Sequence, residues 1–267
     1  MYCRQCQLGQ LAPLPTEQQL AELYGAREYY EGTDQVGYAE YLANAPHLRQ
    51  TFGAKLRWLL RSGPVDTLAE IGCGPGYLLE SARALGVRDA VGVDRNPWAV
   101  EEAQRQGLDV RLGSVEALPA DRRFDAIAML DLLEHITDPA PFLRAVRERL
   151  TPGGRLLIMV PNIRSLLARI SGRRWVSFKI PEHVVYYSRR SIQLALTRAG
   201  LQATAIRAAH QHVPLAFTLD RLSRLAPRLS ACVRTPLRAL GLEQRVIPVT
   251  NGSIDVLATA RADPDRH

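Results

Sequence analysis

Three glycines at alternate positions follow a short apolar run and precede a helical pattern that starts near Tyr77. The segment reads Glu70-Ile71-Gly72-Cys73-Gly74-Pro75-Gly76. Glycine lets the backbone turn tightly and approach a ligand with no side chain in the way. The backbone N–H groups and the start of the following helix then favour a carboxylate or a phosphate. The pattern predicts a turn that binds an anionic group.

An acidic residue stands at the end of the next apolar run. The run Ala90-Val91-Gly92-Val93 ends in Asp94, eighteen residues past Gly76. A carboxylate at the tip of a second strand suits the two hydroxyl groups of a ribose. Together with the glycine turn, Asp94 predicts a site for a cofactor that contains a nucleoside. The plainer interpretation is a tight strand-to-helix turn without a ligand.

Two histidines are candidates for moving a proton in the same region. His135 follows the fourth predicted strand, and His183 lies in a segment that we expect to close over the site. A neutral imidazole takes a proton from a hydroxyl group near neutral pH. Structural roles are one alternative, because His135 can cap the following helix and His183 can hold its loop in place. Removal of the proton by water, or through the acidity of the substrate itself, is the other.

Asp131, Glu134 and His135 lie on one turn after the fourth predicted strand. Two carboxylates and an imidazole could hold a divalent cation that polarises an oxygen of a bound molecule. Solvated carboxylates and a capping histidine account for the same residues more simply. We therefore predict no metal ion and keep the metal site as an alternative.

Strand and helix patterns alternate from Thr67 to about Leu201, at the spacing of βαβ units. Short apolar strands separated by helices predict a parallel sheet with helices on both faces. Ligands of such sheets bind beyond the carboxyl ends of the strands, where Asp94 and His135 stand. The predicted strands are residues 67–72, 89–94, 109–114, 124–131 and 154–161, and the predicted helices are residues 77–85, 97–106, 139–150 and 188–199.

The composition excludes several classes of protein. The net charge is +7, but only Lys55 and Lys179 are lysines among 34 basic residues, and the arginines are spread along the chain. No basic patch with interleaved aromatic residues occurs, so we predict no nucleic-acid partner. No signal peptide or apolar run of membrane-spanning length is found, and the four cysteines form no disulfide framework. These observations predict a cytoplasmic location.

The order of these motifs resembles that of the class I S-adenosylmethionine (SAM) methyltransferases. The segment from Glu70 to Gly76 is similar to their motif I, whose third glycine comes one position earlier than in dinucleotide-binding loops. Residues 112–119 resemble the adenine loop, and residues 150–155 resemble the turn before the fifth strand. The resemblance implies an α/β fold with a Rossmann-like, seven-stranded, mostly parallel sheet, in which residues 201–208 and 253–261 form the antiparallel end.

The same resemblance implies SAM as the cofactor and a set of residues around it. Ser114 stands where an acid is common, which leaves the partner of the adenine amino group open between a backbone carbonyl and Glu116. Asp131 is expected near the reacting sulfonium, since the fourth strand ends beside it. The implied cofactor-binding residues are Glu70, Gly72, Cys73, Gly74, Gly76, Tyr77, Asp94, Arg95, Ser114, Val115, Glu116, Leu130 and Asp131.

Two further segments resemble narrower groups of this family. The residues from Pro181 to Ser188 are similar to a bacterial branch, and Asp131-Leu132-Leu133-Glu134-His135-Ile136 is similar to the ubiquinone-biosynthesis O-methyltransferases. Many branch members begin with a zinc module of two Cys-x-x-Cys knuckles. Here only Cys3 and Cys6 match, followed by the branch's Leu23-Tyr24-Gly25 helix and its turn at residues 29–32. A closed zinc site needs four ligands, so no bound zinc is predicted.

The function implied is transfer of a methyl group from SAM to a small-molecule, sugar or lipid-like acceptor, at oxygen. The candidate catalytic residues are His135, His183 and Asp131. The main alternative is a non-catalytic SAM-binding or scaffold protein. An NAD-linked oxidoreductase is disfavoured by the early third glycine. The acceptor, the methylated atom and the oligomeric state stay open.

The predicted domain organisation has three parts. Residues 1–62 form a helical N-terminal segment with the remnant knuckle, residues 63–212 and 245–262 form the core, and residues 213–244 form a helical insertion. Within the insertion, leucines recur at helical spacing with arginines on the opposite side, and Pro227 is expected to divide it into two helices. A basic amphipathic helix can lie on an anionic membrane, so residues 213–241 are a candidate membrane contact. The alternative is packing on the core or on a second subunit.

Overall fold

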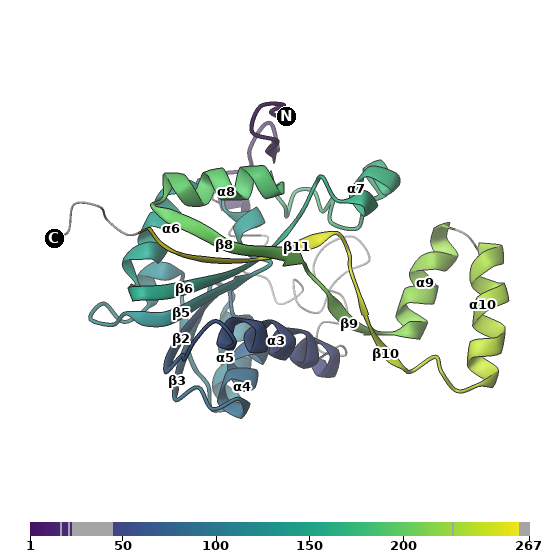
Figure 1. Ribbon diagram of the computed structural model, residues 1–267, viewed down its shortest axis with the longest axis horizontal. Helices are drawn as coiled ribbons and strands as arrows, with labels where there is room; N and C mark the ends of the chain where they lie inside the picture. Colours follow the sequence, from purple (N-terminus) through teal and green to yellow (C-terminus); the bar gives the residue numbers. More distant parts are fainter. Residues whose placement is uncertain (17, 21, 23–44, 226, 262–267) are drawn as a thin grey trace.

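The computed structural model describes residues 1–16, 18–20, 22, 45–225 and 227–261, and its centre is one seven-stranded sheet (Figure 1). The strand order is β4-β3-β2-β5-β6-β11-β8. The first five strands in this order are parallel, and β11 is antiparallel to both of its neighbours. The strands are β2 (Thr67–Ile71), β3 (Asp89–Asp94), β4 (Asp109–Leu112), β5 (Phe124–Leu130), β6 (Leu150–Pro161), β8 (Leu201–Ala208) and β11 (Ser253–Ala260). The predicted Rossmann-like α/β fold is confirmed.

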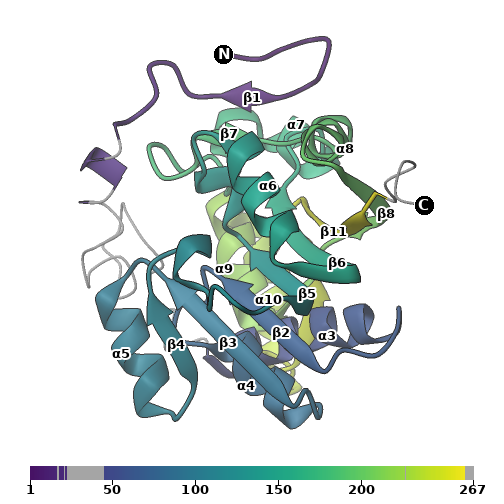
Figure 2. The same cartoon turned by 90° about the vertical axis from the view of Figure 1, so that its left-hand side faces the viewer.

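Helices cover both faces of the sheet because its central strands are apolar on both sides (Figure 2). On β5, Ile127 and Met129 pack in one cluster with helices α6 (Pro139–Glu148) and α8 (Arg189–Arg198). Ala126 and Ala128 point to the other face and pack with α3 (Ala45–Leu60) and α4 (Tyr77–Ala84). Helix α5 (Pro97–Arg105) forms a smaller cluster with the glycine segment. This two-sided burial holds the strand ends, and the loops that follow them, in place.

Most predicted boundaries agree with the structure, with one clear difference. The turn expected over residues 150–155 is part of β6, which starts at Leu150. Its pairing with β5 shifts register between Phe124 and Ala126. A Cβ at Gly154 would lie 2.9 Å from the carbonyl oxygen of Thr151, so the backbone passes too close there for a side chain. The strand therefore runs through residues whose types predict a turn.

Residues 211–249 form an extension that the sequence analysis described only in part (Figure 1). Strands β9 (Gln211–Pro214) and β10 (Val246–Val249) pair as a separate two-stranded sheet, which was not predicted. They carry helix α9 (Leu215–Leu225) and helix α10 (Pro227–Ala239), so Pro227 does begin a second helix. Over the described residues, no helix combines the length and the apolar character needed to cross a membrane.

The N-terminal segment crosses over the Pro-Glu-His region of the chain (Figure 2). Strand β1 (Gly9–Gln10) pairs antiparallel with β7 (Val185–Tyr186), and the backbone N–H of Leu11 donates to the carbonyl of Val184. Cys3 and Cys6 are free thiols here. The segments 23–25 and 29–32, which resemble the branch, lie outside the described residues. The division into three parts stays a prediction.

Candidate functional site

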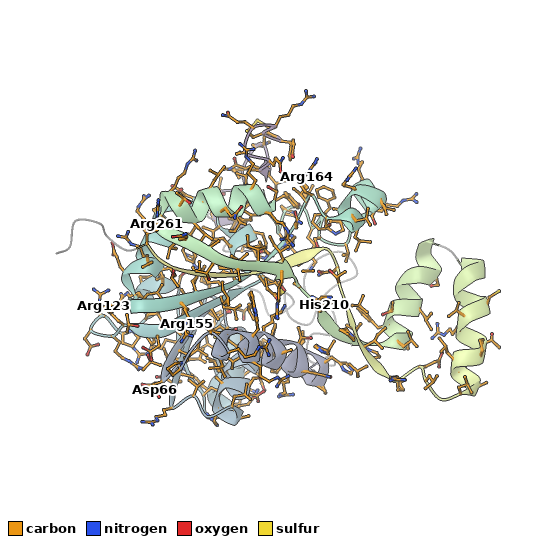
Figure 3. The ribbon with its side chains drawn as sticks, viewed as in Figure 1. Asp66, Arg123, Arg155, Arg164, His210 and Arg261 are labelled. Carbon is orange, nitrogen blue, oxygen red and sulfur yellow. The ribbon has the colours of Figure 1, made fainter. Side chains whose placement is uncertain are left out.

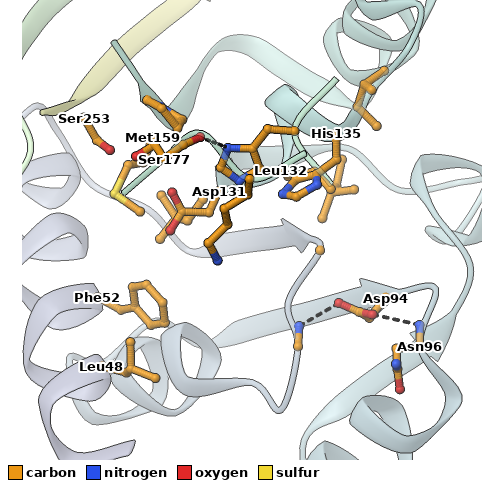
Figure 4. Close-up of a pocket in the computed structure, with 18 of the residues that line it drawn as sticks. Leu48, Phe52, Asp94, Asn96, Asp131, Leu132, His135, Met159, Ser177 and Ser253 are labelled. Atoms are coloured by element: carbon orange, nitrogen blue, oxygen red, sulfur yellow. Dashed lines mark hydrogen bonds between the residues drawn. The ribbon is translucent and has the colours of Figure 1, made fainter. Parts of the chain in front are cut away.

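A cavity of about 710 Å³ lies beyond the carboxyl ends of the parallel strands (Figure 4). The loops after β2, β3, β4 and β5 each contribute lining residues, because parallel strands end at the same edge of a sheet. Seven of the predicted cofactor residues line this cavity: Gly72, Gly74, Asp94, Arg95, Ser114, Leu130 and Asp131. The structure therefore brings together residues that the motifs spread over sixty positions of sequence.

Asp94 ties the glycine segment to the end of β3 (Figure 4). Its Oδ2 accepts a hydrogen bond from the backbone N–H of Gly74, and its Oδ1 accepts one from Asn96, both at 2.8 Å. The N–H groups of Gly72 and Cys73 donate to the carbonyl of Val93. The loop is thus held in shape before any ligand arrives. Each carboxylate oxygen has a second lone pair, which is the acceptor capacity that a ribose needs.

The three glycines share one backbone conformation, and two of them also lie close to a leucine side chain. All have positive φ angles, of 75° at Gly72, 52° at Gly74 and 88° at Gly76. A Cβ at Gly76 would lie 2.3 Å from Cδ1 of Leu108, and a Cβ at Gly72 would lie 3.0 Å from Cδ1 of Leu132. Gly76 therefore permits close packing at the start of α4, while Gly72 keeps the cavity wall free of a side chain.

The other six predicted cofactor residues do not line the cavity. The buried carboxyl of Glu70 has a pKa well above its ordinary value, because burial and the charge of Asp94 disfavour ionisation. Glu116 shapes the adenine loop, since its Oε1 accepts a hydrogen bond from the N–H of Ser114 at 3.0 Å. The remaining four, Cys73, Gly76, Tyr77 and Val115, pack behind the loops. Contact of these six with a cofactor stays a prediction.

The two histidines meet at the opposite side of the cavity. Nδ1 of His135 lies 2.9 Å from the carbonyl oxygen of Glu182, and Nδ1 of His183 lies 2.9 Å from that of Ser177. A carbonyl only accepts, so each Nδ1 carries the proton and each neutral ring has its lone pair on Nε2. The rings are perpendicular, with centroids 4.8 Å apart. Nδ1 therefore anchors each ring, and the lone pair of each ring is on Nε2.

Burial keeps both imidazoles neutral. It lowers the pKa of His135 to about 4, with a backbone hydrogen bond opposing the shift. It lowers the pKa of His183 well below the ordinary value, and the neighbouring His135 and Lys179 lower it further. At neutral pH each Nε2 is thus in the form that accepts a proton.

Asp131 has a strained backbone at the floor of the cavity (Figure 4). Its φ of 52° places a residue with a side chain in the left-handed region. Such outliers concentrate at functional sites. Burial raises the pKa of this carboxyl to about 6, against the opposing charges of Lys55 and Lys179. Asp131 therefore changes charge close to neutral pH.

The potential metal ligands differ from those expected. Among the described residues, Glu134, His135 and His183 have ligand atoms within 4.8 Å of one another, and Asp131 is not part of this group. Burial and the charge of Asp131 raise the pKa of Glu134 well above its ordinary value. A protonated Glu134 and the neutral imidazoles form an uncharged group, in which the carboxyl oxygens of Glu134 are buried without a hydrogen-bond partner among the described residues. The absence of a metal stays a prediction.

The sequence analysis missed most of the wall that faces the cofactor loops. Leu48, Thr51 and Phe52 come from α3, and the remaining lining residues there include Ser177, Lys179, His212, Phe217, Asn251 and Ser253. Among these residues only Lys179 stood out in the sequence, because it is one of the two lysines of the chain. The other, Lys55, is buried in an ion pair with Asp255 at 2.6 Å.

Comparison with known proteins identifies the class. Residues 39–206 match the family described as a methyltransferase domain, which is more than half of the chain. The chain belongs to this family. The ubiquinone biosynthesis O-methyltransferase of Cereibacter sphaeroides is 38% identical over 124 residues, which are 43% of this chain and 50% of that protein. The mitochondrial one of Schizosaccharomyces pombe is 35% identical over 127 residues, 44% of each chain.

Those matches span about half the length of the curated relatives. A solved structure described as a SAM-dependent methyltransferase, possible histamine N-methyltransferase, from Thermotoga maritima has a TM-score of 0.55 at 18% identity. The alignment covers 84% of this chain and 94% of the Thermotoga maritima chain. At this identity the similarity shows the fold alone. The predicted family, the SAM-dependent methyltransferases, is confirmed, with SAM as its cofactor.

Proposed function

We propose that this protein transfers a methyl group from SAM to a hydroxyl oxygen of a small-molecule acceptor. The names of the curated relatives, ubiquinone biosynthesis O-methyltransferases, support oxygen as the methylated atom. The cavity of about 710 Å³ is within the usual range of small-molecule sites. Its wall of Leu48, Phe52 and Phe217 suits an acceptor with a substantial apolar part.

The glycine segment and the loops after β3 and β4 would hold SAM. The cradle at Gly72, where a Cβ would contact Leu132, leaves room for backbone contact with the methionine end. The carboxylate of Asp94 would accept from the ribose hydroxyls, and the backbone near Ser114 would face the adenine. When bound, SAM supplies an electrophilic methyl group on a sulfonium.

The locked tautomer of His183 is the observation on which the proposed mechanism rests. His183 lines the cavity, and its buried Nε2 carries the lone pair and has no hydrogen-bond partner among the described residues, since Nδ1 donates to Ser177. With SAM bound, a new C–O bond would form as the C–S bond breaks, and Nε2 of His183 would take the hydroxyl proton. Asp131, with a pKa of about 6, is the second candidate base. His135 packs edge-on against His183 and positions its ring.

A matched pair of variants tests this assignment. His183→Asn keeps an N–H that can donate to the carbonyl of Ser177 but has no counterpart of Nε2, whereas His183→Gln places an amide near the Nε2 position. The assay follows S-adenosylhomocysteine release with a panel of phenols and alcohols, after calorimetric titration with SAM and with NAD. We expect SAM affinity to survive in both variants and turnover to fall about 100-fold or more. Unchanged turnover would move the base to Asp131, and SAM binding without transfer to any acceptor would support the scaffold alternative.

A further inference from the structure

An exposed apolar surface lies beside the site, on the segment that joins β6 to β7. Its helix is α7 (Leu166–Ser171), followed by a short 3-10 turn at Gly172–Arg174. Leu166 is 70% exposed, Ile170 is 75% exposed and Ile180 is 67% exposed. Leu167, Val176 and Phe178 are also exposed. We call residues 164–180 the α7 surface.

The α7 surface is held firmly from below by other residues of the same segment. Ala168 and Trp175 are buried in a cluster with Tyr186. Nε1 of Trp175 donates to the carbonyl of Asn251 at 2.9 Å, and the ring of Phe178 lies edge-on to that of Trp175. The core contacts of the segment are therefore made by Ala168 and Trp175. The side chains of Leu166, Ile170 and Ile180 instead expose most of their surface to solvent.

The charge of the α7 surface has one sign. Arg164, Arg169, Arg173 and Arg174 are exposed, and no acidic residue occurs between Asn162 and Pro181. Figure 3 shows Arg164 beside α7, whose side chains radiate away from the sheet. Apolar side chains flanked by arginines are the combination that inserts at the boundary between anionic headgroups and acyl chains. Charge and hydrophobicity thus indicate the same kind of partner.

The α7 surface also adjoins the opening of the cavity. Val176, Ser177 and Lys179 line the cavity, although their neighbours Phe178 and Ile180 are exposed. We propose that the α7 surface docks on an anionic phospholipid membrane. If the proposed O-methylation holds, this position would let an amphiphilic acceptor pass from the bilayer into the wall that carries His183. The docking itself does not depend on catalysis.

This proposal differs from the membrane contact predicted for residues 213–241. Leu240, directly after α10, is 70% exposed and so matches Leu166 in type and exposure. The side chains of Arg221, Arg224 and Arg228 lie outside the described part of the structure. Leu240 therefore offers a control position within residues 213–241, the other candidate for membrane contact.

The test is flotation of the purified full chain with vesicles, without SAM or acceptor. One set of vesicles contains phosphatidylglycerol and phosphatidylcholine in equal amounts, and the other contains phosphatidylcholine alone. We expect binding to the anionic vesicles that weakens at high salt. Arg173→Gln with Arg174→Gln should weaken it about 25-fold, at about fivefold per arginine, from about 1 kcal/mol each. Leu166→Glu with Ile170→Glu should abolish it, while Leu240→Glu should not change it.

Three results would overturn the proposal. They are failure of the unaltered protein to float with anionic vesicles, equal binding by the Leu166→Glu, Ile170→Glu variant, and loss of binding in Leu240→Glu instead. Thermal melting and SAM titration of each variant verify folding, since all of these positions are exposed. Failure of methyl transfer leaves vesicle binding intact, so the two proposals fail separately.

Discussion

The two halves of the cavity are built from different parts of the chain. The half that we assign to SAM comes from loops between Gly72 and Leu132, each directly after one strand of the sheet. The opposite half combines α3 with residues 177–183, 211–217 and 251–253. The first half follows from the parallel sheet itself, because its strand ends meet at one edge. The second half exists only where remote segments pack together.

The largest expected effect is on the free energy of unfolding, and it concerns a contact between segments that lie far apart in the chain. Lys55 of α3 and Asp255 of β11 form an ion pair at 2.6 Å, and both side chains are 1% exposed. Lys55→Met leaves Asp255 with Arg207 as its remaining partner, and removing one member of a buried pair costs about 3–5 kcal/mol. Urea unfolding measures the loss in the free energy of unfolding.

The control is the exposed pair between Arg88 and Asp66, whose atoms are 3.6 Å apart. Arg88→Met should leave the free energy of unfolding unchanged. Equal effects of the two substitutions would show that the position of α3 does not depend on the buried pair.

The next effect belongs to the cofactor half. Asp94→Ala removes the acceptor of two hydrogen bonds at 2.8 Å and leaves the N–H groups of Gly74 and Asn96 without it. We expect SAM to bind about 100-fold more weakly, since a hydrogen bond to a charged group is worth about 1.5–3 kcal/mol. Calorimetric titration measures the affinity. His183→Ala, on the other half, should leave it unchanged, and equal SAM affinity in Asp94→Ala and the unaltered protein would refute the assignment.

A smaller effect separates conformation from packing in the glycine segment. Gly76 and Gly107 both have positive φ angles, but a Cβ would meet Leu108 at Gly76 and nothing within 4 Å at Gly107. Gly107→Ala should cost about 1 kcal/mol of strain, and Gly76→Ala should cost about 2–4 kcal/mol because overpacking is added. The difference in the midpoint of urea unfolding tests this. Equal costs would mean that Leu108 moves aside freely.

The smallest effect is on the pH dependence of stability. His135 has a folded pKa of about 4, below its ordinary 6.5, so its contribution is present above pH 6.5 and is lost as pH falls toward 4. Asp131 has a folded pKa of about 6, above its ordinary 3.8, so protonation stabilises the fold as pH falls from 6 to 4. The two contributions oppose each other.

Variants of these two groups should therefore change the slope of the free energy of unfolding against pH in opposite directions. Between pH 6 and 5, His135→Gln should lose less stability than the unaltered protein, and Asp131→Asn should lose more, each by about 1 kcal/mol. Urea unfolding at several pH values measures both slopes. Parallel slopes in all three proteins would show that neither group titrates in this range.

Several predictions from the sequence are confirmed, and the errors share one cause. The strand at 89–94 and the start of α4 at Tyr77 are as predicted, because apolar runs and turn residues specify them locally. The early start of β6 at Leu150 and the sheet of β9 and β10 were missed. Both depend on pairing with another segment, which local composition does not encode.

By itself the sequence determined the family, the parallel sheet and the loops that meet at its edge. Glycine conformations and the acid after β3 are local requirements, so their residue types reveal them. Only the tertiary structure decided which side chains oppose those loops, that His135 and His183 meet ring to ring, and that His183 replaces Asp131 beside Glu134. The physical reason is that these contacts arise from packing between elements far apart in the chain, and burial then sets the protonation of each group.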